Sequence, residues 1–171
     1  MQGVNVVFAL DDSGSMSGRR WEILVENYKS ILRLLKNSNK STVSCVIFNN
    51  YSRICYQNIT PNEALQRNVD YQSGGTDFSS AINQMTNVIQ QIKENRKIIC
   101  IFISDGDSSF PYHALQEMQK VLAHKHSEFF SVSVEYENAG VLIQMSQHMN
   151  GQYIQVSRSE EMMGKLLLAF K

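Results

Sequence analysis

The chain has 171 residues, 43% of them hydrophobic, which is enough for one domain with a core of ordinary composition. Its 16 basic and 16 acidic side chains cancel, and this zero formal net charge argues against a nucleic acid or an anionic membrane as partner. No apolar stretch approaches the roughly 20 residues that a membrane span needs. The N-terminus shows no basic leader and no cleavage site, so we expect no signal peptide and a single domain over residues 1–171.

Apolar runs and amphipathic segments alternate along the chain. In chain order we expect a strand over 4–10, a helix over 21–35, strands over 42–48 and 52–57, a short helix after Pro61, a helix over 78–92, a strand over 97–104, a helix over 113–124, a strand over 129–136, a helix over 140–149, a strand over 153–156 and a closing helix from residue 160. The strands are short and apolar, whereas the helices repeat apolar residues at the 3.6-residue spacing of one helix face.

This alternation predicts an α/β fold with a doubly wound, mostly parallel six-stranded sheet and helices on both faces. The short turn at residues 49–51 makes the strand over 52–57 an antiparallel partner of the strand before it. In open sheets of this kind, ligand sites form beyond the carboxyl ends of the strands. That rule selects residues 11–16 and 104–107, which follow the two most buried strands, and we expect those strands to be neighbours.

The chain contains three cysteines, and their odd number, with no close pair in the sequence, argues against a disulfide framework and a zinc site. Cys45 and Cys100 lie inside apolar runs, where a thiol acts as a small hydrophobic group. This usage favours a reducing, intracellular compartment such as the cytoplasm. Three Asn-x-Ser/Thr sequons favour the alternative of an extracellular protein; they begin at Asn39, Asn50 and Asn58.

Oxygen-bearing side chains gather in three predicted loops. Asp11, Ser13 and Ser15 follow the first strand, Thr76 precedes the helix over 78–92, and Asp105 follows the strand over 97–104. Each residue alone is typical of a helix cap or a solvated loop. Together they form a set of hard oxygen donors without His or Cys, which suits Mg²⁺, Mn²⁺ or Ca²⁺ and disfavours zinc. Four flanking residues are predicted to form a ligand-binding rim: Asp12, Gly75, Asp77 and Asp107.

The segment Asp11-Asp12-Ser13-Gly14-Ser15 resembles the D-x-S-x-S signature of the von Willebrand factor A family. Thr76 in Gly74-Gly75-Thr76-Asp77 resembles the family's threonine, and Asp105 in Ser104-Asp105-Gly106 resembles its distal aspartate. In that family these five residues form a metal-ion-dependent adhesion site. The resemblance covers essentially the whole chain and implies a Rossmann-like sheet with strand order 3-2-1-4-5-6.

The resemblance also implies roles for these residues. Ser13 and Ser15 are expected to bind the metal directly, whereas Thr76 and Asp105 exchange between direct and water-mediated contact. Asp11 is expected to act mainly through water and through hydrogen bonds to the serines. With mostly neutral ligands, the metal, expected to be Mg²⁺, keeps enough positive charge to attract a Glu or Asp of a partner protein. We therefore expect a protein-binding adhesion or scaffolding module, without nucleic acid and as a monomer.

Several residues depart from the family pattern or add charge near it. Asp12 occupies a position that is often apolar in secreted members, and an acid there resembles intracellular members. Asp12 and Asp107 would lower the net charge of the ion if they face it; for Asp12 we favour the alternative that it points to solvent or caps a neighbouring turn. Arg19 and Arg20 begin the first helix, where cations are unfavourable. We expect solvated charges at the rim, with the alternative that one of them faces a carboxylate ligand or Asp12.

Two further functions are weighed against the binding module. A metal-dependent, phosphatase-like hydrolase is an alternative because a metal alone can activate water, although no general base is evident unless Asp107 serves. The chain also contains no Gly-rich phosphate loop, so we predict that it is not an enzyme. Residues 12–17 fit a phosphorylated degron pattern, but their place directly after a buried strand disfavours the exposure that such a signal needs.

Overall fold

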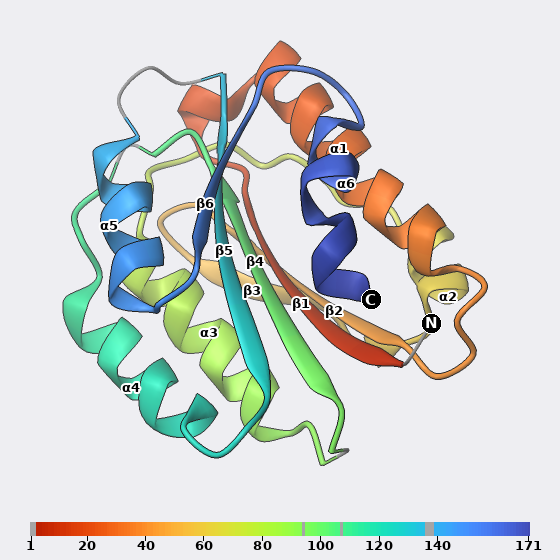
Figure 1. Ribbon diagram of the computed structural model, residues 1–171. Coiled ribbons are helices and arrows are strands. Elements are labelled where there is room, and N and C mark those ends of the chain that lie inside the picture. The colour runs from red at the N-terminus through yellow and green to blue at the C-terminus, as the bar shows by residue number, and fades with distance from the viewer. Residues whose placement is uncertain (1–2, 94, 107, 136–138) are drawn as a thin grey trace.

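The computed structural model describes residues 3–93, 95–106, 108–135 and 139–171. It contains one six-stranded sheet of order β3-β2-β1-β4-β5-β6, in which only the β2–β3 pair is antiparallel (Figure 1). The strands are β1 (Val4–Asp11), β2 (Thr42–Phe48), β3 (Ser52–Ile59), β4 (Lys97–Ser104), β5 (Ser127–Val134) and β6 (Gln152–Val156). The predicted sheet, its strand order and its antiparallel edge strand are confirmed.

Helices cover both faces of this sheet (Figure 1). One face packs against α1 (Arg19–Leu35), α2 (Pro61–Leu65) and α6 (Glu161–Leu166), and the other against α3 (Phe78–Gln90), α4 (Tyr112–Leu122) and α5 (Gly140–His148). Two short 3-10 turns, η1 (Gly14–Met16) and η2 (Leu167–Phe170), complete the described elements. In the described residues, no helix is both long and apolar enough to cross a membrane.

The central strand β1 is buried along its whole length, since both of its faces pack against apolar layers. Alternate side chains enter different cores: Phe8 and Leu10 face the α1 side, whereas Val7 and Ala9 face the α3 side. A continuous apolar run is the pattern expected of such a strand, which explains why periodicity identified it from the sequence. β4 is likewise buried on both faces, and it pairs with β1 in parallel register.

The β2–β3 hairpin contains irregularities that its sequence did not reveal. Cys45 pairs with Tyr56 whereas the next residue, Val46, pairs with Ile54, so Cys55 is an extra residue on β3. This is a β-bulge, in which two residues of one strand oppose one residue of the other. A second register shift lies between Val43 and Cys45. As a result, β3 continues to Ile59, two residues beyond its predicted end.

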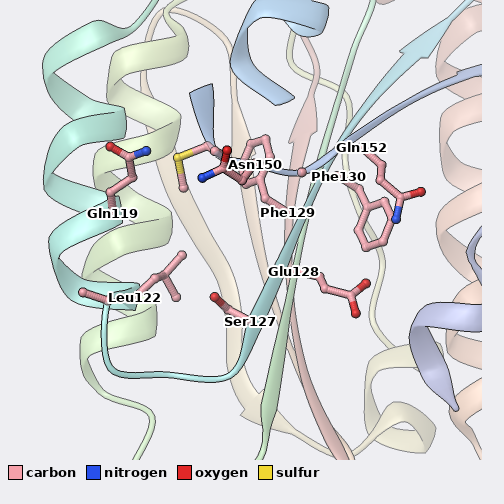
Figure 2. Close-up of a pocket in the computed structure, with 11 residues that line it drawn as sticks. Gln119, Leu122, Ser127, Glu128, Phe129, Phe130, Asn150 and Gln152 are labelled. Carbon is pink, nitrogen blue, oxygen red and sulfur yellow. The ribbon is translucent and has the colours of Figure 1, made fainter. Parts of the chain in front are cut away.

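Two cavities lie at the amino ends of the parallel strands. One, of about 350 Å³, is lined by residues of α4, β5 and the segment before β6, and Figure 2 shows Leu122 of α4 across from Phe129 of β5. The other, of about 920 Å³, lies near Val4, Lys97 and Phe170. Both are at the opposite end of the sheet from the loops that carry the predicted oxygen donors.

Candidate functional site

The predicted oxygen donors lie in three loops that contact one another at the carboxyl end of the sheet. Gly14 of the first loop donates its backbone N–H to the carbonyl of Gly74 in the second, over 2.9 Å. Ser108 of the third loop donates its hydroxyl to the carbonyl of Thr76, over 3.4 Å. A Cβ on Gly14 would meet the Gly74 carbonyl at 3.4 Å, which is an ordinary van der Waals contact, so the hydrogen bond joins the loops without depending on glycine.

Asp11 ends β1 with a carboxylate that has no contact with solvent. Its Oδ1 accepts the backbone N–H of Ser13 at 2.8 Å, and its Oδ2 accepts the Ser104 hydroxyl at 2.6 Å. Burial raises the pKa of Asp11 to about 6, although these hydrogen bonds act in the opposite direction. Asp11 is therefore a rigid carboxylate at the base of the site, held by the last residue of the neighbouring strand.

Ser13 and Ser15 present their hydroxyls side by side, with 3.2 Å between the two Oγ atoms. Ser13 is buried whereas Ser15 is exposed, so the pair leads from the interior to the surface. The η1 turn, which follows Ser13 and contains Ser15, is fixed by the fully buried Met16 and by the Tyr71 hydroxyl, which donates to the carbonyl of Ser13 at 3.0 Å. The alternate spacing predicted such a convergence.

Asp105 is 1% exposed and follows β4 directly. Its Oδ2 accepts a hydrogen bond from Arg20 Nη1 at 3.3 Å, and the same nitrogen donates to the carbonyl of Ser15 at 3.2 Å. Its Oδ1 is buried and has no hydrogen-bond partner among the described residues. Arg20 thus follows the alternative, since it faces the carboxylate of Asp105, whereas Arg19 is an exposed charge that pairs with Glu135.

The second loop contributes less side-chain contact than the other two. Thr76 is half-buried, and its backbone rather than its hydroxyl makes the contact with Ser108. Gly75 is exposed and donates its backbone N–H to Asn50 Oδ1. Asp77 caps α3 by accepting the backbone N–H of Ser80 at 3.1 Å. Asp77 therefore has a structural role at the rim, whereas Asp107 lies outside the described residues.

Of the two arrangements favoured for Asp12 from the sequence, exposure to solvent is wrong, while its carboxylate does accept a backbone N–H from a neighbouring loop. Its carboxylate is fully buried, with Oδ1 accepting from Asn49 Nδ2 at 3.1 Å. Its Oδ2 accepts from Arg53 Nη2 and from the backbone N–H of Gln72, each at 3.0 Å. The charge of Asp12 is thus neutralised inside the protein, because a buried carboxylate needs a cation and several hydrogen-bond donors. Its side chain fixes the loop and does not line a rim.

Three residues of the site were not identified from the sequence: Ser104, Asn49 and Arg53. Ser104 carried a usable signal, since β1 and β4 were expected to be neighbours and both end at the same edge. Asn49 and Arg53 carried none, because their contacts with Asp12 depend on how the β2–β3 hairpin folds over the first loop.

The donor set fits a hard divalent cation, which prefers oxygen ligands. The orphaned Asp105 Oδ1 is a buried charged oxygen that needs a partner, and it belongs to the same loops as the Ser13 and Ser15 hydroxyls. Within the described ranges, no three side chains of the His, Cys, Asp and Glu types form a group that could hold a metal. The predicted set contains only two carboxylates beside three hydroxyls.

These observations define the class of protein. It is a doubly wound α/β domain whose hydroxyl and carboxylate side chains gather at one edge of the sheet. The family model of the von Willebrand factor type A domain matches residues 5–167, so the chain belongs to this family of protein-interaction and adhesion modules. No curated protein sequence matches the chain.

Solved structures share its fold at low sequence identity. An aerotolerance-related membrane protein of Bacteroides fragilis, carrying multiple mutations to serines, is 17% identical with a TM-score of 0.78, over 97% of this chain and 98% of that one. The conserved hypothetical protein BatB of Bacteroides thetaiotaomicron is 19% identical with a TM-score of 0.75, over 98% and 97%. A von Willebrand factor type A protein of Catenulispora acidiphila is 16% identical with a TM-score of 0.74, over 98% of this chain and 42% of that chain.

Proposed function

We propose that this domain binds a divalent cation, Mg²⁺ first and Mn²⁺ or Ca²⁺ as substitutes, and uses that site to bind an acidic residue of a partner protein. The residues that would hold the cation are Asp11, Ser13, Ser15, Thr76 and Asp105. The bound cation would supply the positive charge that attracts the partner's Glu or Asp. The domain would act as a binding module and not as an enzyme.

The observation that carries this proposal is the environment of Asp105. A buried carboxylate oxygen without a hydrogen-bond donor is unfavourable, because the charge has lost its water and gained nothing in return. Arg20 contacts only the other oxygen, and it does so at 3.3 Å, which is long for a charge-assisted hydrogen bond. The carboxylate is therefore held in place with capacity to accept a further positive group.

The charges around the site also support the binding of an anionic partner group. Asp12 is neutralised by Arg53, so it does not add to the negative charge of the donor set. Of the donors, only Asp11 and Asp105 are carboxylates, and the hydroxyls of Ser13, Ser15 and Thr76 are neutral. Two carboxylates would balance a divalent cation, and Arg20, which pairs with Asp105, would leave the loaded site with a net positive charge. The exposed Ser15 places this region at the protein surface, where a partner side chain has access.

An intracellular location is part of the proposal. The three cysteines, Cys45, Cys55 and Cys100, are all free thiols, which is typical of a reducing compartment. The alternatives of an extracellular adhesion domain and of a phosphatase-like hydrolase gain no specific observation. The candidate general base of a hydrolase, Asp107, lies outside the described residues.

A capture experiment tests the proposal. The purified chain is immobilised and exposed to cell extract with Mg²⁺ or with chelator, and calorimetry measures cation binding in parallel. We expect cation uptake by the wild-type chain, Mg²⁺-dependent capture of partners, and loss of both in Asp105→Ala. Asp70→Ala is the matched control because Asp70 is an exposed carboxylate outside the donor set. Equal capture in all conditions, or an absence of cation binding by the folded wild type, would contradict the proposal.

A further inference from the structure

Two of the three thiols lie on neighbouring strands at the bulge of the β2–β3 hairpin. Cys45 opposes Tyr56, and the extra residue Cys55 directly precedes Tyr56 on β3. Both cysteines pack on the α1 side of the sheet, Cys45 within the buried core and Cys55 against its edge. In a β-bulge two residues of one strand oppose one residue of the other, so Cys55 and Tyr56 both lie opposite Cys45. Directly opposed residues have Cα atoms about 4.5–5.5 Å apart, and a disulfide spans up to roughly 7 Å.

The two thiols are also near enough to act on each other, since Cys45 is the largest influence on the pKa of Cys55. The Cys45 thiol itself lies 3.9 Å from the Val46 carbonyl. The two thiols differ in their exposure to solvent. Cys45 is completely buried, whereas Cys55 is half-buried and its sulfur lies 3.7 Å from the carbonyl of Asn68 in the loop above it. Cys55 is therefore the thiol that a dissolved reagent meets first, with Cys45 directly behind it.

The surroundings of Cys55 favour its thiolate. The hydrogen bond from Cys45 lowers the pKa of Cys55 to about 7, with help from Arg53 and Arg67 and against the effects of burial and of Asp70. Burial raises the pKa of Cys45 well above its usual value. The Cys55 thiolate is the nucleophile that can begin thiol–disulfide exchange, whereas Cys45 must lose its proton before it can attack in the second step.

We propose that Cys45 and Cys55 form a reversible disulfide by exchange with a low-molecular-weight disulfide such as oxidised glutathione. The Cys55 thiolate attacks one sulfur of that disulfide, a mixed disulfide forms and one glutathione thiolate leaves. Cys45 then loses its proton, and its thiolate attacks Cys55 Sγ; the second glutathione leaves as a thiolate and takes up that proton. Two protein thiols are oxidised and one glutathione disulfide is reduced to two thiols, so the step balances.

The position of this pair links it to the loop that carries Asp12. Arg53 lies two residues before Cys55 on the same strand and holds the buried Asp12 carboxylate through Nη2. The Cys45–Cys55 disulfide would therefore involve β3, the strand whose Arg53 supports the first loop of the candidate site. Formation of this disulfide involves only the two thiols and the hairpin and does not depend on the proposed cation site.

The test treats the folded chain with oxidised or reduced glutathione, quenches with acid, labels the remaining thiols and maps the products by mass spectrometry. We expect the wild type to lose two hydrogens and to yield a Cys45–Cys55 linked peptide with Cys100 still labelled. Dithiothreitol should restore both thiols. Cys100→Ala, the matched control, should oxidise at the wild-type rate because Cys100 lies in β4 on the opposite face.

Two further variants separate the steps. In Cys45→Ser, Cys55 should retain one glutathione, because no second thiol displaces it; in Cys55→Ser, Cys45 should remain a free thiol. A wild-type chain that keeps glutathione on Cys55 as stably as Cys45→Ser would overturn the proposal. So would dimers linked through Cys55, or a native chain whose Cys45 and Cys55 are labelled as fully after oxidised as after reduced glutathione.

Discussion

At the scale of single residues, the hydrogen-bond donors around each buried carboxylate decide whether it has a structural role or can bind a further group. Asp12 and Asp105 are both buried, yet Asp12 receives three donors whereas only one oxygen of Asp105 has a donor in the described chain. Burying a charge is tolerated when it is paired and hydrogen-bonded, so Asp12 is a structural carboxylate. Asp105 is left with an open position, which makes it suitable for binding.

Arg20 is predicted to compete with the cation for Asp105. Replacing it as Arg20→Gln should raise cation affinity by roughly fivefold, because a partly exposed ion pair is worth at most about 1 kcal/mol and 1.4 kcal/mol corresponds to tenfold. Titration calorimetry with Mg²⁺ or Mn²⁺ measures the effect. Arg19→Gln is the matched control, since Arg19 is exposed and pairs with Glu135. Unchanged or weaker binding in Arg20→Gln would show that Arg20 does not compete.

Cys55 is predicted to react as a thiolate near neutral pH. The pKa of the Cys55 thiol is lowered to about 7. Its alkylation rate should therefore rise with pH, and the midpoint of that rise should lie near pH 7. Cys45→Ala should move the midpoint upward because it removes the principal hydrogen bond. Cys100, whose pKa burial raises to about 12, should stay unreactive over the same range. Rates of iodoacetamide labelling, followed by peptide mapping, check this; a wild-type midpoint above 8.5 would contradict it.

At the scale of elements, boundaries followed the apolar pattern where a strand is buried on both faces. β2 and β4 have their predicted bounds because each is a mostly apolar run buried between two cores. β5 begins at Ser127, two residues before the prediction, since its first residues are polar but still pair with β4. It ends at Val134, and residue 136 lies outside the described residues. Backbone pairing therefore extends strands beyond their apolar pattern.

The entry into β6 depends on a glycine. Gly151 approaches β5 so closely that a Cβ there would lie 2.1 Å from the carbonyl oxygen of Phe129. Gly151→Ala should destabilise the fold by about 1–3 kcal/mol, the usual cost of overpacking. Gly164→Ala, the control in α6, meets nothing within 4 Å and should stabilise by about 0.5–1 kcal/mol through helix propensity. Chemical denaturation measures both; similar midpoints for the two variants would contradict the packing argument.

At the scale of the whole molecule, the sheet separates two cores and leaves the candidate site at its carboxyl edge. The donor side chains lie outside the main apolar clusters, so binding and stability should respond separately to substitution. A ligand that binds only the folded state raises its stability by about 2.7 kcal/mol at a hundredfold excess over Kd. For a domain of this size, that corresponds to about 5–10 °C in Tm.

We therefore predict that Mg²⁺ at saturating concentration raises the Tm of the wild type by about 5–10 °C. Ser13→Ala should show little shift with Mg²⁺, while its metal-free stability changes by about 1 kcal/mol or less because one hydrogen bond between two serine hydroxyls is lost. Differential scanning calorimetry with Mg²⁺ and with chelator measures both quantities. A wild-type Tm that is the same in both buffers would contradict a cation site.

The sequence by itself determined the fold class, the order of elements and the types of donor in the loops, because these depend on local periodicity and on side-chain chemistry. Only the tertiary structure decided which charges meet. Arg20 lies 85 residues from Asp105 and Arg53 lies 41 residues from Asp12, and these contacts arise from the packing of α1 and of the β2–β3 hairpin against the loops. The Cys45–Cys55 contact likewise depends on a bulge that adds one residue to β3. The physical reason is that local patterns report which side chains are buried, whereas the partner of a buried polar group depends on how distant segments approach one another.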